Sequence, residues 1–219
     1  MISIIIPTLD EAGHLPVTLK KIRANSAAHE IIIADGGSHD ATLQIAIAAG
    51  ANIVTSDKSG RSLQMNAGAK TASGDIFLFL HGDTHLHDFS LEQIAGALKN
   101  ERVVGGGFAR RFDSDSLFLR CTCAVATLRC SLFGLFLGDQ GIFVRRNVFE
   151  KLGGFREMKL FEDVDFSRRL AQAGKTVTLR PAVISSARRF AGRGPVLMTC
   201  RDLWLTCKYV SGLENYSAR

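Results

Sequence analysis

Short apolar runs that end just before acidic residues recur in the first half of the chain. The runs and the acids after them are Ile2 to Ile6 with Asp10 and Glu11, Ile31 to Ala34 with Asp35, and Ile76 to Leu80 with Asp83. Runs of this length and composition predict buried parallel strands. Because parallel strands end at one edge of their sheet, we expect these acids to cluster there, where open α/β folds bind ligands. Helix capping is the other common role of an Asp that follows a strand.

Segments with helical spacing lie between these strands. Leu15, Leu19 and Ile22 recur at the spacing of one helix face. We expect further helices at residues 41–49 and 62–72 and a third strand at residues 51–55. Strands that alternate with helices predict an α/β fold with a mainly parallel sheet, and the length of 219 residues suits a single domain.

The second half of the chain begins with a glycine-rich strand and a long apolar segment. Val103 to Phe112 contains three successive glycines, which predict a strand where another group approaches the backbone closely. Leu117 to Gly138 is the most apolar segment, but Arg120 and Arg129 within it offset the free energy of membrane insertion. We therefore expect a helix that packs on the core or lies on a membrane surface, and both placements stay open.

Two further polar segments interrupt the rest of this half. Gly138-Asp139-Gln140 precedes the apolar run 142–144, and residues 149–155 predict a short helix. Glu162, Asp163 and Asp165 then begin a helix, where acids also complement the helix dipole. If this helix start faces the edge that contains Asp83, one of its carboxylates would be placed to act as a general base.

The charge of the chain indicates an anionic partner. The formal net charge is +6 at pH 7, which suits nucleotide phosphates, nucleic acid or an acidic membrane surface. No aromatic RNA-binding pattern or helix-turn-helix signature is found, so we expect no nucleic acid partner. A predicted helix at residues 196–210 places Trp204 among Arg201 and Lys208, which permits contact with a membrane interface. The first residues read as a strand and not as a signal peptide, so we expect a cytoplasmic protein.

Five short motifs, in their order and spacing, resemble those of the family 2 glycosyltransferases. They are Pro7 to Glu11, Ala34 to Thr42, His81 to Asp83, Gly138 to Gln140 and Phe161 to Asp165. The chain is most similar to the short, single-domain members of the arsenosugar-biosynthesis type, and the resemblance covers nearly its whole length. It implies the GT-A fold, a Rossmann-like, mixed but mainly parallel sheet flanked by helices. Residues 1–100 would form the nucleotide-sugar donor half, and residues 101–219 the acceptor half with a basic C-terminal helix.

The resemblance assigns roles to several donor-side residues. Thr8 and Glu11 would border the nucleoside, and Asp35 would accept a hydrogen bond from the base. Arg61, with Asn66 in the same segment, matches the basic residue that family members use near the nucleotide.

The resemblance also implies a divalent metal, Mn²⁺ or Mg²⁺. Asp83 matches the metal-binding end of the Asp-x-Asp signature, while His81 replaces its first Asp. A neutral imidazole adds no negative charge, so such a metal would depend mainly on Asp83 and on the diphosphate itself.

On the acceptor side, the resemblance makes Asp163 the base that deprotonates the acceptor hydroxyl. Glu162 would be its neighbour or an acceptor ligand, and Gly138, Asp139 and Gln140 would form the acceptor-side edge.

Together these expectations describe an inverting, metal-assisted glycosyltransferase that uses a nucleotide-diphosphate sugar, with a UDP-sugar favoured. The acceptor would be a small molecule or a lipid-linked compound, and peripheral contact with a membrane stays open. Two other functions remain alternatives. A sugar-phosphate nucleotidyltransferase would need a glycine-rich, lysine-containing phosphate loop, which residues 7–13 lack. A non-catalytic nucleotide-sugar-binding protein would share the fold and the donor site.

Overall fold

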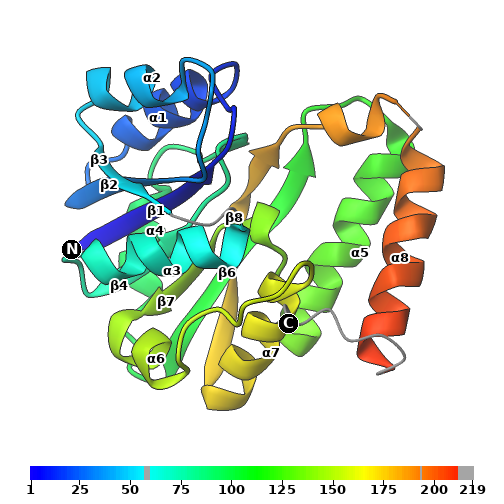
Figure 1. The fold of residues 1–219 in the computed structure, drawn as a ribbon. Helices are drawn as coiled ribbons and strands as arrows, with labels where there is room; N and C mark the ends of the chain where they lie inside the picture. Colours follow the sequence, from blue (N-terminus) through cyan, green and yellow to red (C-terminus); the bar gives the residue numbers. More distant parts are fainter. Residues whose placement is uncertain (57–59, 193, 212–219) are drawn as a thin grey trace.

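One mixed sheet runs through the molecule and separates its helices into two layers. The computed structural model describes residues 1–56, 60–192 and 194–211 (Figure 1). In these ranges eight strands form a sheet of order β3-β2-β1-β4-β7-β6-β8-β5. The strands are β1 (Ile2–Thr8), β2 (His29–Asp35), β3 (Asn52–Thr55), β4 (Ile76–Phe79), β5 (Thr84–His85), β6 (Val103–Phe112), β7 (Ile142–Arg145) and β8 (Lys175–Ser185).

Eight α-helices and two short 3₁₀ helices accompany the strands in the described ranges. The α-helices are α1 (Leu15–Arg23), α2 (Thr42–Ala48), α3 (Arg61–Thr71), α4 (Ser90–Ala97), α5 (Leu117–Phe133), α6 (Arg146–Lys151), α7 (Glu162–Ala173) and α8 (Pro195–Val210). The 3₁₀ helices are η1 (Gly138–Gln140) and η2 (Arg188–Phe190).

The N-terminal strands are parallel, as their apolar runs predict. β1 pairs with β2 and β4 on its two sides, and β2 pairs with β3. In this register Thr8 lies opposite Asp35, so the segments after these strands emerge at one edge. The predicted clustering of the acids that follow β1, β2 and β4 is confirmed.

The C-terminal strands turn the sheet into a mixed one. β7 is antiparallel to both β4 and β6, β8 is parallel to β6, and β5 is antiparallel to β8. The glycines of β6 are needed for this packing, because a Cβ at Gly106 would collide with the carbonyl oxygen of Val177. The predicted close approach at these glycines, and the predicted α/β fold with a mixed, mainly parallel sheet, are confirmed.

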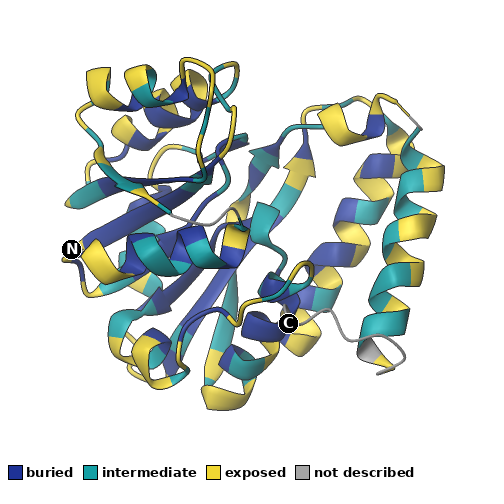
Figure 2. Cartoon of the chain, in the orientation of Figure 1, coloured by how far each residue is buried: buried dark blue, intermediate teal, exposed yellow. Residues whose placement is uncertain are grey.

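Each face of the sheet has its own apolar core, because successive strand residues point to opposite sides. Ile4 and Ile6 pack on one face, with apolar residues of α1, α2 and α4. Ile5 and Phe79 pack on the other face, with residues of α3, α5, α6 and α7. Figure 2 shows the buried strands between helices whose outer faces are exposed.

Several predicted elements differ from those in the structure. α5 ends at Phe133 and not at Gly138, because Gly134 adopts a left-handed conformation with φ 63°. The short helix predicted at residues 149–155 lies at α6 instead. α4 and β8 were not predicted from the sequence. β8 contains Pro181, which lacks a backbone N–H and lies opposite an irregularity in its pairing with β6.

α5 packs one face on the protein core, through Leu119, Cys123, Ala126 and Cys130. Among the described residues, no helix combines the length and the apolar character that crossing a bilayer requires. Residues 212–219 of the predicted basic tail lie outside the described residues.

Candidate active site

Two carboxylates at the edge of the sheet meet one guanidinium. Asp83 follows β4, Glu11 follows β1, and Arg188 belongs to η2 after β8. Arg188 Nη2 lies 2.5 Å from Glu11 Oε1 and 3.1 Å from Asp83 Oδ2. Burial raises the pKa of Asp83, and the neighbouring positive charge of Arg188 opposes that shift. The site thus concentrates the negative charge of two acids around the guanidinium of Arg188.

Thr8 and Asp35 form a second, buried group at the same edge. The Thr8 hydroxyl donates to Asp35 Oδ1 at 3.0 Å, and the backbone N–H groups of Gly37 and Ser38 donate to Oδ2. Burial opposes ionisation of Asp35, but these hydrogen bonds and one from the Ser38 hydroxyl hold its pKa below the ordinary value. The Asp35 carboxylate therefore shapes the loop after β2.

Seven of the residues singled out from the sequence line one hollow of about 440 Å³. They are Arg61, His81, Asp83, Gly138, Asp139, Glu162 and Asp163. The opposite wall comes from η2 and from α8, through Arg188, Asp202, Leu205 and Thr206. The start of α7 therefore faces the same space as the segment after β4, as the general-base hypothesis requires.

Asp163 lies at the start of α7, and two backbone N–H groups hold its carboxylate. Its Oδ2 accepts a hydrogen bond of 2.6 Å from the N–H of Gly138, and its Oδ1 accepts one of 2.7 Å from the N–H of Val164. Burial raises the pKa of Asp163, against these hydrogen bonds and the charge of Arg61. A carboxylate that is oriented in this way and has a raised pKa has the properties of a general base.

Glu162 lies beside Asp163 and is buried. Its Oε1 is 3.5 Å from Nη1 of Arg61, the first residue of α3. Burial and the adjacent charge of Asp163 raise the pKa of Glu162, while Arg61 lowers it. Phe161, just before this pair, has a φ of 69°, which is unfavourable for a residue with a side chain. The strained turn thus directs both acids into the hollow.

His81 is a neutral residue in this hollow. Burial, together with the charge of Arg61, lowers the pKa of His81 to about 3. Its Nε2 atom is buried and has no hydrogen-bond partner among the described residues. A Cβ at Gly138 would lie 2.5 Å from this Nε2 and 3.5 Å from Asp163 Oδ2, so any side chain at Gly138 would require the His81 ring to shift.

Asp139, which lines the hollow, forms a part-buried ion pair. Its Oδ2 lies 2.5 Å from Nη1 of Arg110 on β6. Burial would raise the pKa of Asp139, but the charge of Arg110 outweighs it and holds the pKa below the ordinary value. The pair anchors η1, and with it Gly138, against the sheet.

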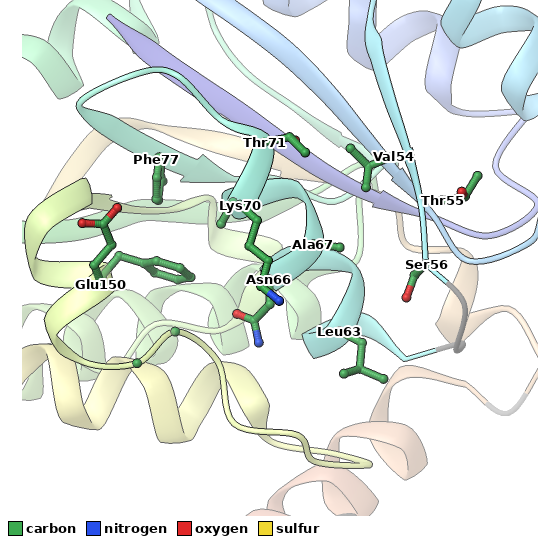
Figure 3. A pocket seen from close by; sticks show the side chains of 14 residues that line it. Val54, Thr55, Ser56, Leu63, Asn66, Ala67, Lys70, Thr71, Phe77 and Glu150 are labelled. Atoms are coloured by element: carbon green, nitrogen blue, oxygen red, sulfur yellow. The ribbon is translucent and has the colours of Figure 1, made fainter.

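Five of the predicted site residues do not line this hollow. Thr8, Glu11 and Asp35 lie at the carboxyl edge described above, and the other two are Gln140 and Asn66. The Gln140 side chain is fully buried and bonds to Arg129, Leu137 and the Phe108 carbonyl oxygen, so it fixes the turn. Asn66 bonds both backbone groups of Phe155 and lines another hollow of about 820 Å³ beside α3 and α6 (Figure 3). Asn66 follows Arg61 by five positions, about 140° around the helix, which separates the two side chains.

The residues present can be tested against the implied divalent metal. Within the described ranges, no three His, Cys, Asp or Glu side chains form a group that would hold a metal by themselves. Asp83 and Glu11 nevertheless offer hard oxygen ligands at one point, where they already hold a cation, and no described residue bonds the buried Glu11 Oε2. Oxygen ligands of this kind suit Mg²⁺ or Mn²⁺ when a diphosphate completes the coordination shell. The donor set fits such a metal only with ligand oxygens added.

The roles of Arg188 and Arg110 were not predicted from the sequence. Arg188 follows β8, which was not recognised as a strand, so its place at the carboxyl edge was hidden. Arg110 lies in a strand whose glycines disturb the alternation of apolar and polar residues. The one signal of an ion pair at Arg110 was its position as a charged residue in a strand that is otherwise largely apolar.

Comparisons with known proteins agree with this architecture. Residues 3–158 match the family profile described as Glycosyl transferase family 2. A curated relative, the PGL/p-HBAD biosynthesis glycosyltransferase of Mycobacterium bovis (strain BCG / Pasteur 1173P2), is 31% identical over 214 residues. That alignment covers 88% of this chain and 78% of the relative.

Two solved structures share the fold. The mannosyltransferase PcManGT from Pyrobaculum calidifontis, in complex with GDP-Man and Mn²⁺, has a TM-score of 0.71 and 19% identity, over 88% of this chain and 58% of that one. S. aureus TarS 1-349 in complex with UDP-GlcNAc has a TM-score of 0.69 and 17% identity, over 85% of this chain and 58% of that one. The chain thus spans less than two thirds of each of these neighbours.

The fold is therefore the GT-A fold of glycosyltransferases, with the acids after β1, β2 and β4 at its ligand-binding edge. The family profile covers most of the chain, and the mycobacterial relative matches nearly all of it. The chain belongs to glycosyl transferase family 2 and is a glycosyltransferase enzyme.

Proposed function

We propose that this enzyme transfers a sugar from a nucleotide-diphosphate sugar to an acceptor hydroxyl with inversion of configuration, and that the donor is a UDP-sugar. One observation carries the proposal: the base-like carboxylate of Asp163 and the cation-binding carboxylate of Asp83 line the same hollow. Transfer needs a base on the acceptor side and a cation on the leaving diphosphate, and a shared space allows both to act on one donor.

Residues 1–100 form the donor half in this proposal. Thr8 and Glu11 border the nucleoside, and Asp35 binds the base after its loop adjusts. Arg61, His81 and Asp83 face the diphosphate, with Asn66 further along the same helix as Arg61. The complexes of TarS with UDP-GlcNAc and of PcManGT with GDP-Man, on the same fold, support a nucleotide sugar as donor.

A divalent metal, Mn²⁺ or Mg²⁺, belongs to the proposal, with Asp83 as its protein ligand and the Glu11 carboxylate beside it. When bound, such a metal would neutralise charge that develops on the leaving diphosphate. Arg188 is the guanidinium that this chain already holds at the two carboxylates, at 2.5 and 3.1 Å. It is placed to bind a phosphate oxygen once the donor enters.

Asp163 acts as the general base. Its carboxylate takes the proton of the acceptor hydroxyl while the acceptor oxygen forms a bond to the anomeric carbon. The bond from that carbon to the diphosphate oxygen breaks at the same time, and the electron pair leaves with the nucleoside diphosphate. A single displacement of this kind inverts the configuration. The hydrogen bonds from Gly138 and Val164 support this role because they fix the orientation of the carboxylate.

Residues 101–219 form the acceptor half. Gly138 and Asp139 border the acceptor, Glu162 contacts it beside the base, and Gln140 supports the turn from below. The acceptor class stays open between a small molecule and a lipid-linked compound. The transfer reaction proposed here does not depend on peripheral contact with a membrane surface.

Calorimetric titration of the purified protein with UDP, GDP and other nucleoside diphosphates, with and without Mn²⁺ or Mg²⁺, tests the donor site. We expect UDP to bind most tightly and to need the metal. A preference for another base would correct the choice of donor, and absence of binding to every nucleotide under all conditions would overturn the proposal.

A further inference from the structure

The exposed apolar side chains of the protein are concentrated on two neighbouring helices. α5 and α8 lie side by side at one edge of the molecule (Figure 1). Of the sixteen large apolar side chains exposed in the described ranges, six lie on α5 and four on α8. We call the exposed faces of these two helices the α5–α8 surface.

The exposed face of α5 is a continuous apolar stripe. It consists of Leu117, Cys121, Val125, Leu128 and Leu132, which recur every three or four residues. The exposed fractions of its large side chains run from 58% at Leu128 to 71% at Leu117. The opposite face of the helix is buried against the core. A helix with a solvated outer face normally carries polar residues there. An exposed apolar stripe of this kind is typical of an interaction surface.

α8 repeats the pattern and also lines the active site. Val196, Cys200, Leu203, Trp204 and Cys207 are exposed along one side, and no side chain described on this helix is fully buried. The other side carries Asp202, Leu205 and Thr206, which line the hollow that contains Asp163. Figure 2 shows the exposed segments along α8. One helix therefore connects the apolar surface with the catalytic space.

The charges on these helices are almost all positive. α5 carries Arg120 and Arg129 and no acid, while α8 carries Arg201 and Lys208 with Asp202 as its single acid. Asp202 is already paired with Arg189 of η2. Arg120 and Arg201 are exposed beside the apolar stripes. The surface thus combines apolar side chains, a tryptophan and the exposed cations Arg120 and Arg201.

We infer that the α5–α8 surface docks the enzyme on an anionic lipid bilayer. Apolar side chains, an interfacial tryptophan and flanking arginines are the features that bind helices to the headgroup region of such a membrane. A second copy of the chain fits less well. A two-fold interface would bring the arginines of one copy toward those of the other, and neither helix offers an unpaired acid to balance them.

Docking in this way would bring the opening beside Asp202, Leu205 and Thr206 close to the lipid. This consequence rests on the proposed function, and it favours a lipid-linked acceptor over a small soluble one. The docking itself depends only on the α5–α8 surface.

Co-sedimentation of the full chain with vesicles tests the inference. We expect the protein to sediment with vesicles made of equal parts phosphatidylcholine and phosphatidylglycerol, and much less with phosphatidylcholine alone. The bound fraction should fall as salt rises, because the arginines contribute through their charge. Absence of binding to both kinds of vesicle would overturn the inference, as would equal binding to both.

Variants on each helix identify the surface. Val125→Gln with Leu128→Gln on α5, and Leu203→Gln with Trp204→Gln on α8, should each reduce vesicle binding about ten-fold or more. Because these side chains are exposed, the variants are expected to fold, and circular dichroism checks this. Ile47→Gln is the matched control, since Ile47 is 66% exposed on α2, away from both helices. Equal binding by the α5, α8 and control variants would contradict the assignment.

Two more measurements separate this inference from other outcomes. Sedimentation velocity without lipid reports self-association. If the wild type forms a dimer that the α5 and α8 variants abolish, and does not bind vesicles, the α5–α8 surface would be a dimer interface and not a membrane-docking surface. UDP titration of the same variants reports the donor site. Vesicle binding without nucleotide binding would refute the proposed function and leave the docking surface standing, while the reverse result would refute docking alone.

Discussion

Arg188 Nη2 lies 3.1 Å from Asp83 Oδ2, so the carboxylate proposed to hold a metal already holds a guanidinium. The two residues are far apart in sequence and come from the ends of different strands. The same nitrogen bonds Glu11, which makes Arg188 the shared cation of two acids. A metal bound at Asp83 would therefore compete with Arg188 for the same oxygen atoms.

This competition predicts how Arg188→Ala changes metal affinity. Removing the guanidinium frees Asp83, so the affinity for Mn²⁺ without nucleotide should rise, up to about five-fold for a partly exposed ion pair. Mn²⁺ titration followed by calorimetry or electron paramagnetic resonance measures this. Arg189→Ala is the control, because Arg189 pairs with Asp202 and not with Asp83. Unchanged or weaker Mn²⁺ binding by Arg188→Ala would show that the pair does not compete.

Asp163→Asn tests the general base. The amide keeps the shape of the side chain but does not accept the proton, so transfer should fall by about 10²–10⁴. UDP affinity should stay within a few-fold, because the change lies on the acceptor side. Nucleotide release from the donor and calorimetry measure the two properties. Glu150→Gln, an exposed acid outside the hollow, serves as control. Transfer by Asp163→Asn at the wild-type rate would rule out Asp163 as the base. A wild-type protein that binds the donor but transfers no sugar would favour the alternative of a non-catalytic binding protein.

The raised pKa of Asp163 predicts the direction of the pH dependence. The base works only when ionised, and burial makes it take up a proton at a higher pH than an ordinary Asp. The value of kcat at saturating donor should therefore fall as pH falls through this raised pKa, and it should level off above it. Measuring kcat at saturating donor separates this effect from the protonation of Asp83, because protonation of Asp83 would weaken donor binding. A kcat that is constant or rises toward acid pH would contradict the assignment.

Gly138→Ala should destabilise the protein. The new Cβ would lie 2.5 Å from His81 Nε2, and overpacking of this kind costs about 1–3 kcal/mol. For a chain of this size each kcal/mol lowers Tm by roughly 2–4 °C, which calorimetry detects. Gly96→Ala is the matched control. A Cβ at Gly96, inside α4, meets nothing within 4 Å, so the change should be neutral or stabilising.

The clash also predicts a rescue. Replacing His81 by Ala in the Gly138→Ala background removes the atoms that the new Cβ meets, so the double variant should lose less stability than the sum of the two single changes. Strict additivity would place the cause of the loss elsewhere.

Much of the parallel half of the sheet could be predicted from the sequence. The run Ile2 to Ile6 and the run before Asp83 are buried on both faces, and such strands must be apolar throughout. Because parallel strands end at one edge of the sheet, the proximity of Glu11 and Asp83 could be predicted from the strand pattern alone. The start of α7 could be singled out for a similar local reason, since three acids stand there, but only the resemblance to family 2 glycosyltransferases selected Asp163 among them.

The partners of these residues were decided by tertiary structure. Nothing near Asp83 in sequence indicates Arg188, because their contact depends on how β8 joins the sheet, and Pro181 obscures β8 in the sequence. Likewise, Gln140 and Asp139 are adjacent, yet one is buried in a network of hydrogen bonds and the other lines the hollow. Local sequence does not distinguish these two environments.

The apolar segment from Leu117 illustrates the same division. Its sequence determined that it forms an apolar helix, because helix formation depends on local spacing and its end depends on Gly134. Whether Leu128 would be buried could not be read from that pattern, since apolar residues occur on every side of the helix. Only the position of α5 at the edge of the fold, with the core on one side and α8 beside it, decided which apolar residues remain exposed.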